Sequence, residues 1–556
     1  MPIPGGPRPS HTPPRHLSEV AAQLAVSRPD LIGHEIGREV GREVDPATGP
    51  EVDPATGTDE DDVLITGVSL GSRSVRPGDL YAALPGARAH GADYAGEAQR
   101  AGAVAVLTDA EGARRVRTQG VTLPVITVET PRARLGALAA WLYGRPAERL
   151  HTFGVTGTNG KTTTTFLLDG ALRTLGYHTG LIGTVELRVD TEVVPSTGTT
   201  PEAPDLHALL AVMLEHGVDA CSMEISSHAL AQHRVDGLTV DVAGYTNLSR
   251  DHLDYHRTMA EYFEAKAVLF SPPYAHRAVV CLDDDWGRRL AERVQADGVP
   301  LVTVGARPTV GDACDWQVLS IEHRGGLAVA QLQVRHDGRE QQVRLPVPLP
   351  GDFNLANAVL AAAMLTEAYP VDPVDAVAAV ARSGPVPGRM ERVDAATRRP
   401  GAPLAVVDYA HTPDAVRAAL EALRATAKPL VVVLGAGGDR DREKRPMMGA
   451  AAAAVADMVV ITDDNPRSED PAAIRAAVLT GARDRASAAV EVLEIGDRRA
   501  AIVRAVELAW TDAGTGVVLV AGKGHERGQE IVRDGVSEVH PFDDRQVLRE
   551  VLESGR

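Results

Sequence analysis

Cysteine is scarce in this chain of 556 residues: Cys221, Cys281 and Cys314 are the only three, and they lie far apart. Their spacing excludes a disulfide framework and a C-x-x-C metal site, and it favours a reducing compartment. No apolar run approaches the roughly 20 residues that span a bilayer, and the Pro-rich N-terminus lacks the apolar segment of a secretory signal. We therefore expect a cytoplasmic protein without a membrane span.

An excess of positive charge is also lacking. The chain has 57 Lys and Arg against 75 Asp and Glu, which gives a net charge of −18. This balance argues against a broad surface for nucleic acid or membranes, so an anionic ligand needs arginines, lysines or helix N-termini placed in defined motifs. We expect a monomer whose partners are small molecules.

The length is too great for one hydrophobic core and predicts several domains. Residues 1–62 are expected to be a weakly ordered extension, in which VDPATG occurs twice and a helix covers about Leu17 to Ala25. From residue 63 onward short apolar strands alternate with helices, which is typical of parallel α/β sheets.

We expect three α/β domains after that extension. They are a small N-terminal domain over residues 63–150, a central P-loop ATPase-like domain over 151–384, and a C-terminal Rossmann-like domain over 385–556. Period-two alternation at 316–349 predicts an antiparallel patch within the central domain.

The segment GVTGTNGKTTTT, residues 154–165, has the composition of a phosphate-binding loop. Its first glycine lies one residue earlier than in the usual G-x-x-x-x-G-K-[ST] pattern. A glycine turn between a strand and a helix points N–H groups at an anion, with Lys161 reaching the β- and γ-phosphates and Thr162 reaching Mg²⁺. The predicted ATP-binding residues are Gly157, Thr158, Asn159, Gly160, Lys161, Thr162 and Thr163. The alternative is a plain glycine turn before a Thr-rich helix.

TGTNGKTTT with this spacing resembles the Mur ligase superfamily, whose members are ATP-dependent amide-forming ligases. Further motifs follow in the family's order, among them MEISSHALAQHRV, TNLSRDHLDYH, YFEAKAVLF, GRMERV, VVDYAHTPDA, TDDNPRSEDP and AGKGHE. The resemblance covers about residues 63–550. It is strongest to the branch that adds the third amino acid to UDP-N-acetylmuramoyl-dipeptide during peptidoglycan precursor synthesis.

The resemblance implies four catalytic residues, Lys161, Glu224, His252 and Lys266. It also implies Mg²⁺ held by Thr162, Glu224, His252 and Lys266, the last as a carbamate formed with CO₂, because an ammonium group cannot bind a metal. Taken without the resemblance, Glu224 is an exposed acid at a strand end and His252 a solvated loop histidine. Lys266 is then a surface lysine paired with Glu on an amphipathic helix.

The resemblance further implies that the acceptor is UDP-N-acetylmuramoyl-L-Ala-D-Glu, with its uridine on the N-terminal domain. The residues expected to bind it are Leu70, Ser72, Thr199, Thr200, Ser226, Gln232 and Arg234. Arg234 is expected to pair with a carboxylate, whereas the two threonines alone could form only a turn before a helix over 202–216. Gly71, Gly198 and Cys281 depart from residues common in the family, and these departures are expected to weaken single contacts only.

The sequence DNPR, residues 464–467, follows the apolar run MVVIT and so lies at a strand C-terminus, where ligands bind in such sheets. In the family DNPR marks enzymes that use meso-diaminopimelate. Arg467 and Arg440 can each grip a carboxylate, and lysine, which lacks the distal carboxylate, leaves such an arginine unpaired at a cost of about 1.5–3 kcal/mol per contact. The predicted amino-acid site is Arg440, Asp464, Asn465, Pro466, Arg467, Gly522 and Glu526.

We therefore expect a ligase that uses ATP to convert the D-Glu carboxylate into an acyl phosphate, which the amine of diaminopimelate attacks. Residues 383–389, SGPVPGR, are the expected hinge for domain closure. Three alternatives remain: a lysine-adding ligase, a folate-glutamate ligase, and a non-catalytic protein that binds nucleotide precursors.

Overall fold

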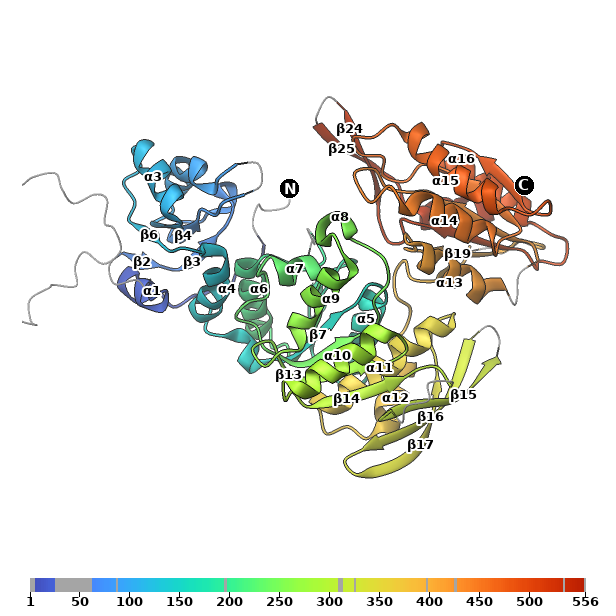
Figure 1. Ribbon diagram of the computed structural model, residues 1–556, viewed down its shortest axis with the longest axis horizontal. Helices are drawn as coiled ribbons and strands as arrows, with labels where there is room; N and C mark the ends of the chain where they lie inside the picture. Colours follow the sequence, from blue (N-terminus) through green and yellow to red (C-terminus); the bar gives the residue numbers. More distant parts are fainter. Residues whose placement is uncertain are drawn as a thin grey trace, which may run out of the picture. The chain divides into compact units, whose positions relative to one another are not determined.

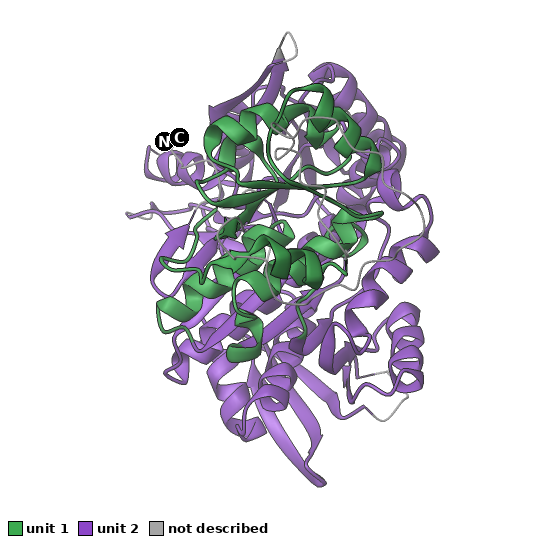
Figure 2. Cartoon of the chain, turned by 90° about the vertical axis from the view of Figure 1, so that its left-hand side faces the viewer, with its two compact units in different colours: residues 1–150, 200–218, 228–239 green, residues 151–199, 219–227, 240–556 purple. Residues whose placement is uncertain are grey.

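The structure is a computed structural model that describes residues 6–25, 63–86, 89–194, 198–308, 314–324, 327–396, 399–424, 428–533 and 536–554. The chain forms two compact units, shown in separate colours in Figure 2. Unit 1 contains residues 1–150, 200–218 and 228–239, and unit 2 contains residues 151–199, 219–227 and 240–556. Among the described residues, no helix is both long enough and apolar enough to span a membrane.

Unit 1 is built on a four-stranded parallel sheet in the order β3-β4-β5-β6. Its strands are short and apolar, as expected of strands buried on both faces. Helices α4 and α6 pack side by side next to this sheet (Figure 1). Its elements are β3(Gly67–Ser69), η2(Ser72–Ser74), β4(Asp79–Ala82), η3(Gly91–Tyr94), α2(Ala95–Ala101), β5(Ala105–Thr108), α3(Ala110–Thr118), β6(Val125–Thr127), α4(Pro131–Leu142), η4(Pro146–Arg149) and α6(Ala203–Glu215).

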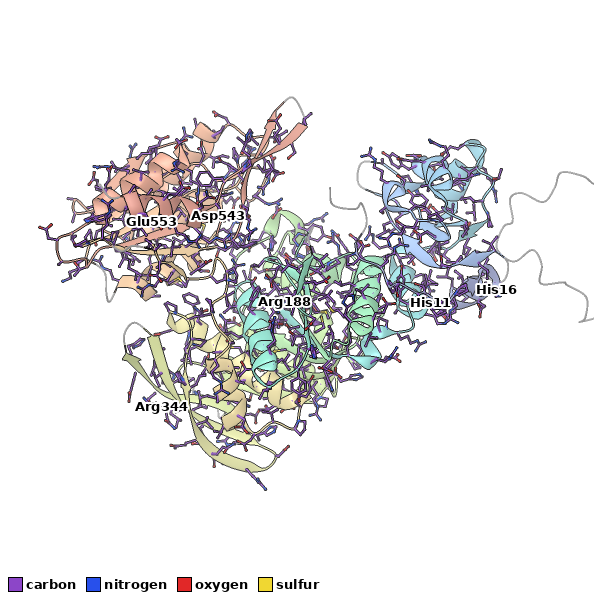
Figure 3. The ribbon with its side chains drawn as sticks, turned by 180° about the vertical axis from the view of Figure 1, so that it is seen from behind. His11, His16, Arg188, Arg344, Asp543 and Glu553 are labelled. Carbon is purple, nitrogen blue, oxygen red and sulfur yellow. The ribbon has the colours of Figure 1, made fainter. Side chains whose placement is uncertain are left out.

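The segment before residue 26 is part of this unit. β1(Arg15–His16) pairs antiparallel with β2(Leu64–Ile65), and α1(Leu17–Gln23) places Leu17 and Val20 in the core. The predicted helix is thus confirmed. Residues 6–16, expected to be linker, are instead held on the domain because Arg8 pairs with the buried Asp79 and Ser10 donates to Glu215. His11 and His16 mark this segment in Figure 3. Residues 1–5 and 26–62, with both VDPATG copies, lie outside the described residues.

The first part of unit 2 has an eleven-stranded sheet in the order β10-β9-β8-β11-β7-β12-β13-β14-β15-β16-β17. Strands β8, β11, β7, β12, β13, β14 and β15 run parallel, and β16 and β17 continue the same sheet antiparallel (Figure 1). The predicted antiparallel patch is therefore confirmed as an extension of the parallel sheet.

Helices α5, α11 and α12 pack against this sheet and against one another. On β9, Arg188 (labelled in Figure 3) pairs with Asp169 of α5 and Glu186. The elements are β7(His151–Thr156), α5(Lys161–Thr174), β8(Thr179–Ile182), β9(Leu187–Val189), β10(Glu192–Val194), β11(Ala220–Glu224), α7(Ser227–Ala231), β12(Val240–Tyr245), α8(Leu253–His256), α9(Met259–Ala267), η5(Val268–Phe270), β13(Ala275–Cys281), α10(Asp285–Ala296), β14(Leu301–Gly305), β15(Trp316–Arg324), β16(Leu327–His336), β17(Arg339–Pro346), α11(Asp352–Ala368) and α12(Pro373–Ala381).

The last part of unit 2 has a six-stranded sheet in the order β18-β19-β23-β20-β21-β22, parallel except for β18. A two-stranded ribbon, β24–β25, stands out from it (Figure 1). The elements are β18(Glu391–Val393), β19(Leu404–Asp408), α13(Pro413–Arg424), β20(Leu430–Leu434), α14(Lys444–Ala453), β21(Met458–Ile461), α15(Pro471–Arg485), β22(Glu491–Glu494), α16(Arg498–Ala509), β23(Val517–Ala521), β24(Gly528–Arg533), β25(Val536–Pro541) and α17(Asp544–Ser554). The predicted α/β class with three sheet-based parts is confirmed, whereas the domain boundaries stay predictions.

Candidate active site

The phosphate loop joins the end of β7 to the start of α5. Gly157 has φ 150° and Gly160 has φ 91°, a backbone that glycine adopts without strain. A Cβ on Gly157 would lie 1.9 Å from Thr246 Oγ1, and one on Gly160 would lie 2.3 Å from Asn357 Oδ1. Both glycines are therefore required by close packing as well as by conformation.

The segment after β12 supports this loop. Asn247 accepts hydrogen bonds from the N–H groups of Thr158 (2.8 Å) and Asn159 (3.1 Å), and Thr246 Oγ1 donates to Asn159 O at 2.6 Å. Those two N–H groups are thus used within the protein. The N–H groups at the start of α5 are the ones that helix geometry leaves for a phosphate, while Lys161 Nζ donates to Gly157 O and Thr158 O, each at 3.0 Å.

Glu224 ends β11, the neighbour of β7, and lies opposite Val155 in the sheet register. It is 1% exposed and accepts hydrogen bonds from Thr162 Oγ1 (3.0 Å), Thr184 N (2.8 Å) and Thr184 Oγ1 (3.2 Å). The interpretation of Glu224 as an exposed strand-end acid is therefore wrong. No role for Thr184 was predicted from the sequence, where its only signal is its place directly after the apolar run HTGLIG.

Arg389 brings a positive charge to the same group, since its Nη2 donates to Thr162 Oγ1 at 3.0 Å. Its guanidinium lies over the Tyr409 ring, 4.4 Å from the ring centroid, and His525 lies on that ring as well, with centroids 5.4 Å apart. Burial, together with the charges of Arg389 and Arg545, lowers the pKa of His525 to about 3, so this imidazole is neutral at pH 7. No role was predicted for Arg389, Tyr409 or His525 from the sequence.

Lys266 on α9 is fully buried, not on the surface as its helix pattern suggests. Its Nζ donates to Gly157 O at 2.8 Å and lies 4.5 Å from the centroid of the Tyr262 ring. Gly157 O is also the acceptor for Lys161 Nζ. Burial first, and then the nearby charge of Lys161, lower the pKa of Lys266 well below its ordinary value. A neutral amine is therefore accessible at this position.

His252 precedes α8 with φ 55°, and its ring centroid lies 6.1 Å from that of Tyr262. Its neighbour Asp251 is buried and close to three basic side chains, with His252 Nε2 at 3.5 Å, Lys444 Nζ at 3.5 Å and His411 Nε2 at 3.7 Å. Burial would raise the pKa of Asp251, but the hydrogen bond from His411 and the attraction of these basic groups outweigh it and hold that pKa well below its usual range.

The metal set expected from the sequence is only partly assembled by direct contact. Thr162 and Glu224 place two oxygen donors 3.0 Å apart, which suits a hard cation such as Mg²⁺. In the part of the chain that the structure describes, three or more His, Cys, Asp or Glu do not come together as a metal site. Ligation by His252 and by Lys266 stays a prediction.

The residues expected to bind the acceptor divide between the units: Leu70, Ser72, Thr200, Gln232 and Arg234 belong to unit 1, and Thr199 and Ser226 to unit 2. Within unit 1, Arg234 contacts Gln232 Oε1 at 2.6 Å and Thr200 O at 3.3 Å, and it pairs with Glu202 at 3.0 Å. The structure thus brings three of them together. Ser72 Oγ donates to Glu97 at 2.9 Å, and in unit 2 Thr199 Oγ1 accepts from Thr184 at 2.9 Å.

Four loops meet at the carboxyl edge of the C-terminal sheet, because the strands before them, β19, β20, β21 and β23, are parallel. The loops are 409–412, 435–443, 462–470 and 522–527. Gly522, with φ 110°, is so close to the DNPR loop that a Cβ on it would lie 2.5 Å from Asp464 Oδ2. The predicted amino-acid residues from separate motifs are therefore neighbours.

Lys523 lies at the centre of this edge with no exposed surface. Its Nζ donates to Asn465 Oδ1 at 2.8 Å and to Glu526 Oε2 at 3.0 Å, and lies 3.7 Å from Asp464 Oδ1. Asn465 Nδ2 donates to Glu526 Oε2 at 2.8 Å. Lys523 was missed from the sequence, where only its place inside GKGHE singled it out.

Arg467 and Arg440 lie around Gly437, where a Cβ would be 3.0 Å from Arg467 Nη1 and 3.9 Å from Arg440 Cγ. Arg467 Nη1 donates to Gly438 O at 2.7 Å, and its Nε pairs with Glu530 Oε2 at 2.9 Å. The edge thus gathers arginines that suit carboxylates next to acids that suit ammonium groups.

Comparison with known proteins agrees with this geometry. Three family profiles match: "Mur ligase family, catalytic domain" at residues 64–143, "Mur ligase middle domain" at 155–365, and "Mur ligase, glutamate ligase domain" at 388–524. The UDP-N-acetylmuramoyl-L-alanyl-D-glutamate--2,6-diaminopimelate ligase of Streptomyces avermitilis is 48% identical over 555 residues, covering 100% of this chain and 99% of the relative. The chain belongs to the Mur ligase family.

Other relatives of this Mur ligase agree. The ligase of the same name from Corynebacterium glutamicum is 48% identical over 496 residues, which are 88% of this chain and 92% of the relative. A solved structure of a UDP-N-acetylmuramoyl-L-alanyl-D-glutamate--2,6-diaminopimelate ligase has a TM-score of 0.60 and 32% identity, and covers 88% of this chain and 95% of that one. The folylpolyglutamate synthase of Mycobacterium tuberculosis, at 22% identity and a TM-score of 0.57, shares the fold over 71% of this chain and 93% of that one.

The family predicted from the motifs is thereby confirmed, and this Mur ligase is an enzyme of the ligase class. Two groups of contacting residues thus form within unit 2. The first contains the predicted phosphate loop and Glu224, and the second contains the residues predicted to bind the amino acid.

Proposed function

We propose that this Mur ligase joins meso-diaminopimelate to the D-Glu carboxylate of UDP-N-acetylmuramoyl-L-Ala-D-Glu in peptidoglycan precursor synthesis. A carboxylate oxygen takes the γ-phosphoryl group of ATP, which gives an acyl phosphate and ADP. The amine nitrogen of diaminopimelate then attacks the acyl carbon, phosphate leaves, and the nitrogen loses a proton. The substrate assignment rests on one observation: Arg440, Arg467, Asp464 and Glu526 lie together at one edge of the C-terminal sheet. The chain is also 48% identical to relatives named for this reaction.

The phosphate loop supplies the positive field for the first step. The start of α5 and Lys161 bind the phosphates of ATP, and Arg389 adds a cation at Thr162. Mg²⁺ fits the adjacent oxygens of Thr162 and Glu224, and when bound it offsets the repulsion between phosphate and carboxylate. Because two anions must approach each other, this concentration of cations in a protein of net charge −18 is the main electrostatic contribution.

Carbamylation of Lys266 is part of the proposal. Its neutral amine attacks the carbon of CO₂, an N–C bond forms, and the proton released leaves a carbamate anion. Two ammonium groups donating to one carbonyl, Gly157 O, repel each other, whereas a carbamate on Lys266 attracts Lys161. The lowered pKa of Lys266 supplies the neutral amine that the reaction requires.

The rival functions make different predictions from the same residues. A lysine-adding ligase does not require two arginines at the carboxyl edge of the C-terminal sheet. A non-catalytic binding protein does not require Lys161, Glu224 and Lys266 to be intact. Closure about residues 383–389, a monomeric state and a cytoplasmic location also belong to this proposal. Small-angle scattering with and without all ligands tests closure, and sedimentation velocity tests the monomer.

The deciding experiment measures ADP release from ATP with Mg²⁺ and UDP-N-acetylmuramoyl-L-Ala-D-Glu, comparing meso-diaminopimelate with L-lysine. We expect turnover with diaminopimelate, little with lysine, and a loss of at least about tenfold in Arg467→Lys, because lysine cannot replace a bidentate guanidinium. Turnover with lysine alone would move the assignment to the lysine-adding branch, and none with either to the binding protein.

A further inference from the structure

Strand β24 lies along the DNPR loop and hydrogen-bonds to it as a neighbouring strand does. The N–H of Arg467 donates to Glu530 O at 3.1 Å, and the N–H of Val532 donates to Arg467 O at 2.8 Å, so that Arg467 and Ile531 form a parallel bridge. Both backbone groups of Arg467 are thus satisfied by the ribbon.

The same strand holds the residues before Arg467. Gln529 Nε2 donates to Asp464 O at 2.6 Å, and the N–H of Glu530 donates to Asn465 Oδ1 at 3.0 Å. Asn465 in turn binds Lys523 and Glu526. The position of the whole loop therefore depends on β24.

Arg467 needs this support because its backbone is left-handed, with φ 52°. That conformation is disfavoured for a residue with a Cβ and persists only where the surroundings fix it. The bridge to β24 fixes it from both sides of the residue, which aims the Arg467 side chain along a direction that an ordinary strand or helix backbone does not give.

The side chain is fixed as well. Glu530 Oε2 accepts from Arg467 Nε at 2.9 Å, and the other oxygen of Glu530 accepts from Ser537 Oγ on β25 at 3.1 Å. On its opposite side Arg467 donates to Gly438 O at 2.7 Å. These contacts use two of the five guanidinium donors, and the described part of the chain shows no other hydrogen bond from them.

We propose that Glu530 is a positioning residue that determines amino-acid specificity by holding Arg467 for the distal carboxylate of the substrate. It occupies the Nε edge and leaves the remaining N–H donors for a carboxylate. Because Glu530 already pairs with Arg467 at 2.9 Å, the expectation that lysine leaves this arginine wholly unpaired is corrected: lysine leaves only the remaining N–H donors without a carboxylate. Selectivity then comes from the fixed direction of the guanidinium. This inference rests on the proposed function, because it concerns the amino-acid substrate.

The test compares Glu530→Ala, Glu530→Gln and the matched control Glu538→Ala, a glutamate of the same ribbon that pairs with His540 at 3.5 Å. The assay is ADP release with varied diaminopimelate. We expect Glu530→Ala to raise KM for diaminopimelate about tenfold with kcat within about threefold, as for the loss of one charge-assisted hydrogen bond. Glu530→Gln, which keeps an acceptor for Nε, and Glu538→Ala should stay within about threefold of the parent.

A double-mutant cycle separates positioning from a general structural role. In the Arg467→Ala background, Glu530→Ala should have no further effect on that KM, because its target is gone. A further rise of about tenfold in that KM in the double variant would overturn the proposal. A change in kcat without a change in KM in Glu530→Ala would overturn it as well. If the parent protein itself turns over no diaminopimelate, the proposed function fails, and Glu530 is then judged by exchange of the Arg467 Nε–H in ¹⁵N NMR. Unchanged protection of that proton in Glu530→Ala would overturn the positioning role by itself.

Discussion

The Arg389 guanidinium donates through Nη2 to Thr162 Oγ1 at 3.0 Å, although the two residues are 227 positions apart in the chain. Thr162 in turn donates to Glu224 at 3.0 Å. The last residue of the expected hinge, residues 383–389, thus touches the hydroxyl where the nucleotide and metal are proposed to meet. Arg389 thus already adds a cation from the segment before the C-terminal sheet to the phosphate loop.

Arg389→Ala should lower kcat/KM for ATP by roughly 10- to 100-fold, since a charge-assisted hydrogen bond contributes about 1.5–3 kcal/mol. Steady-state ADP release measures it. Arg392→Ala is the matched control, because Arg392 is an exposed arginine three residues away that pairs only at the surface with Asp394. Equal rates in both variants would contradict the role of Arg389.

Growth or incubation with ¹³C-bicarbonate should introduce one carbamate carbon per chain, detectable by ¹³C NMR and absent in Lys266→Ala. Lys428→Ala, which removes an exposed lysine, should keep the signal. Removal of CO₂ should lower turnover of the parent protein and of Lys428→Ala, and it should not change the residual turnover of Lys266→Ala. The signal should strengthen as pH rises through the lowered pKa of Lys266, because only the neutral amine reacts. A parent protein without the signal argues against the carbamate.

Lys523→Met should raise KM for diaminopimelate by about 10-fold or more, because Asp464 and Glu526 lose the buried cation between them. The exposed Arg527 of the same loop gives the control variant, Arg527→Ala. An unchanged KM in Lys523→Met would show that the acids keep their places without the lysine.

Asp544→Ala should destabilise the C-terminal part by about 3–5 kcal/mol, the usual effect of leaving one partner of a buried ion pair alone. Arg498 and Asp544 have no exposed side-chain surface and share two hydrogen bonds of 2.8 and 2.7 Å, and Arg498 also donates to Ala521 O at the end of β23. Urea unfolding followed by tryptophan fluorescence measures the loss. Its neighbour Asp543, labelled in Figure 3, is only partly buried, so a much smaller effect is expected for Asp543→Ala.

His207 should make unit 1 less stable in weak acid. It is completely buried on α6, and burial lowers its pKa to about 4 from 6.5. Between those values the unfolded chain binds a proton that the folded chain does not, so stability falls as pH falls through this window. From pH 7 to pH 5 the loss attributable to His207 is roughly 2 kcal/mol. Thermal unfolding should therefore show a smaller pH dependence in His207→Gln than in the parent.

Local patterns in the sequence predicted much of this structure. The run HTFGVTG followed by a Thr-rich segment predicted β7, the loop and α5, because glycine turns and alternating apolar strands act over a few residues. The motif DNPR was placed at a strand end for the same reason. Such features need no knowledge of the rest of the chain.

The residues that were predicted wrongly or not at all are those whose environment depends on long-range packing. Lys266 has the helix pattern of a surface residue, and only the approach of the phosphate loop, 109 positions earlier, buries it. Arg389, Lys523 and Glu530 were missed because they contact Thr162, Asn465 and Arg467, which are 227, 58 and 63 positions away in the chain. The sequence shows which reactive side chains the protein has. Only the tertiary contacts show which of these side chains lie close to one another.

The charges at the C-terminal sheet edge have a further consequence. Among the side chains that lie together there, Arg440, Arg467 and Lys523 are three cations, and Asp464, Glu526 and Glu530 are three anions, so the charges of these six cancel. Diaminopimelate, with two ammonium groups and two carboxylates, is also neutral, whereas lysine carries one net positive charge. Capture of the amino acid should therefore vary little with ionic strength, in contrast to ATP, whose charged phosphates are attracted to Lys161 and Arg389 by interactions that salt screens.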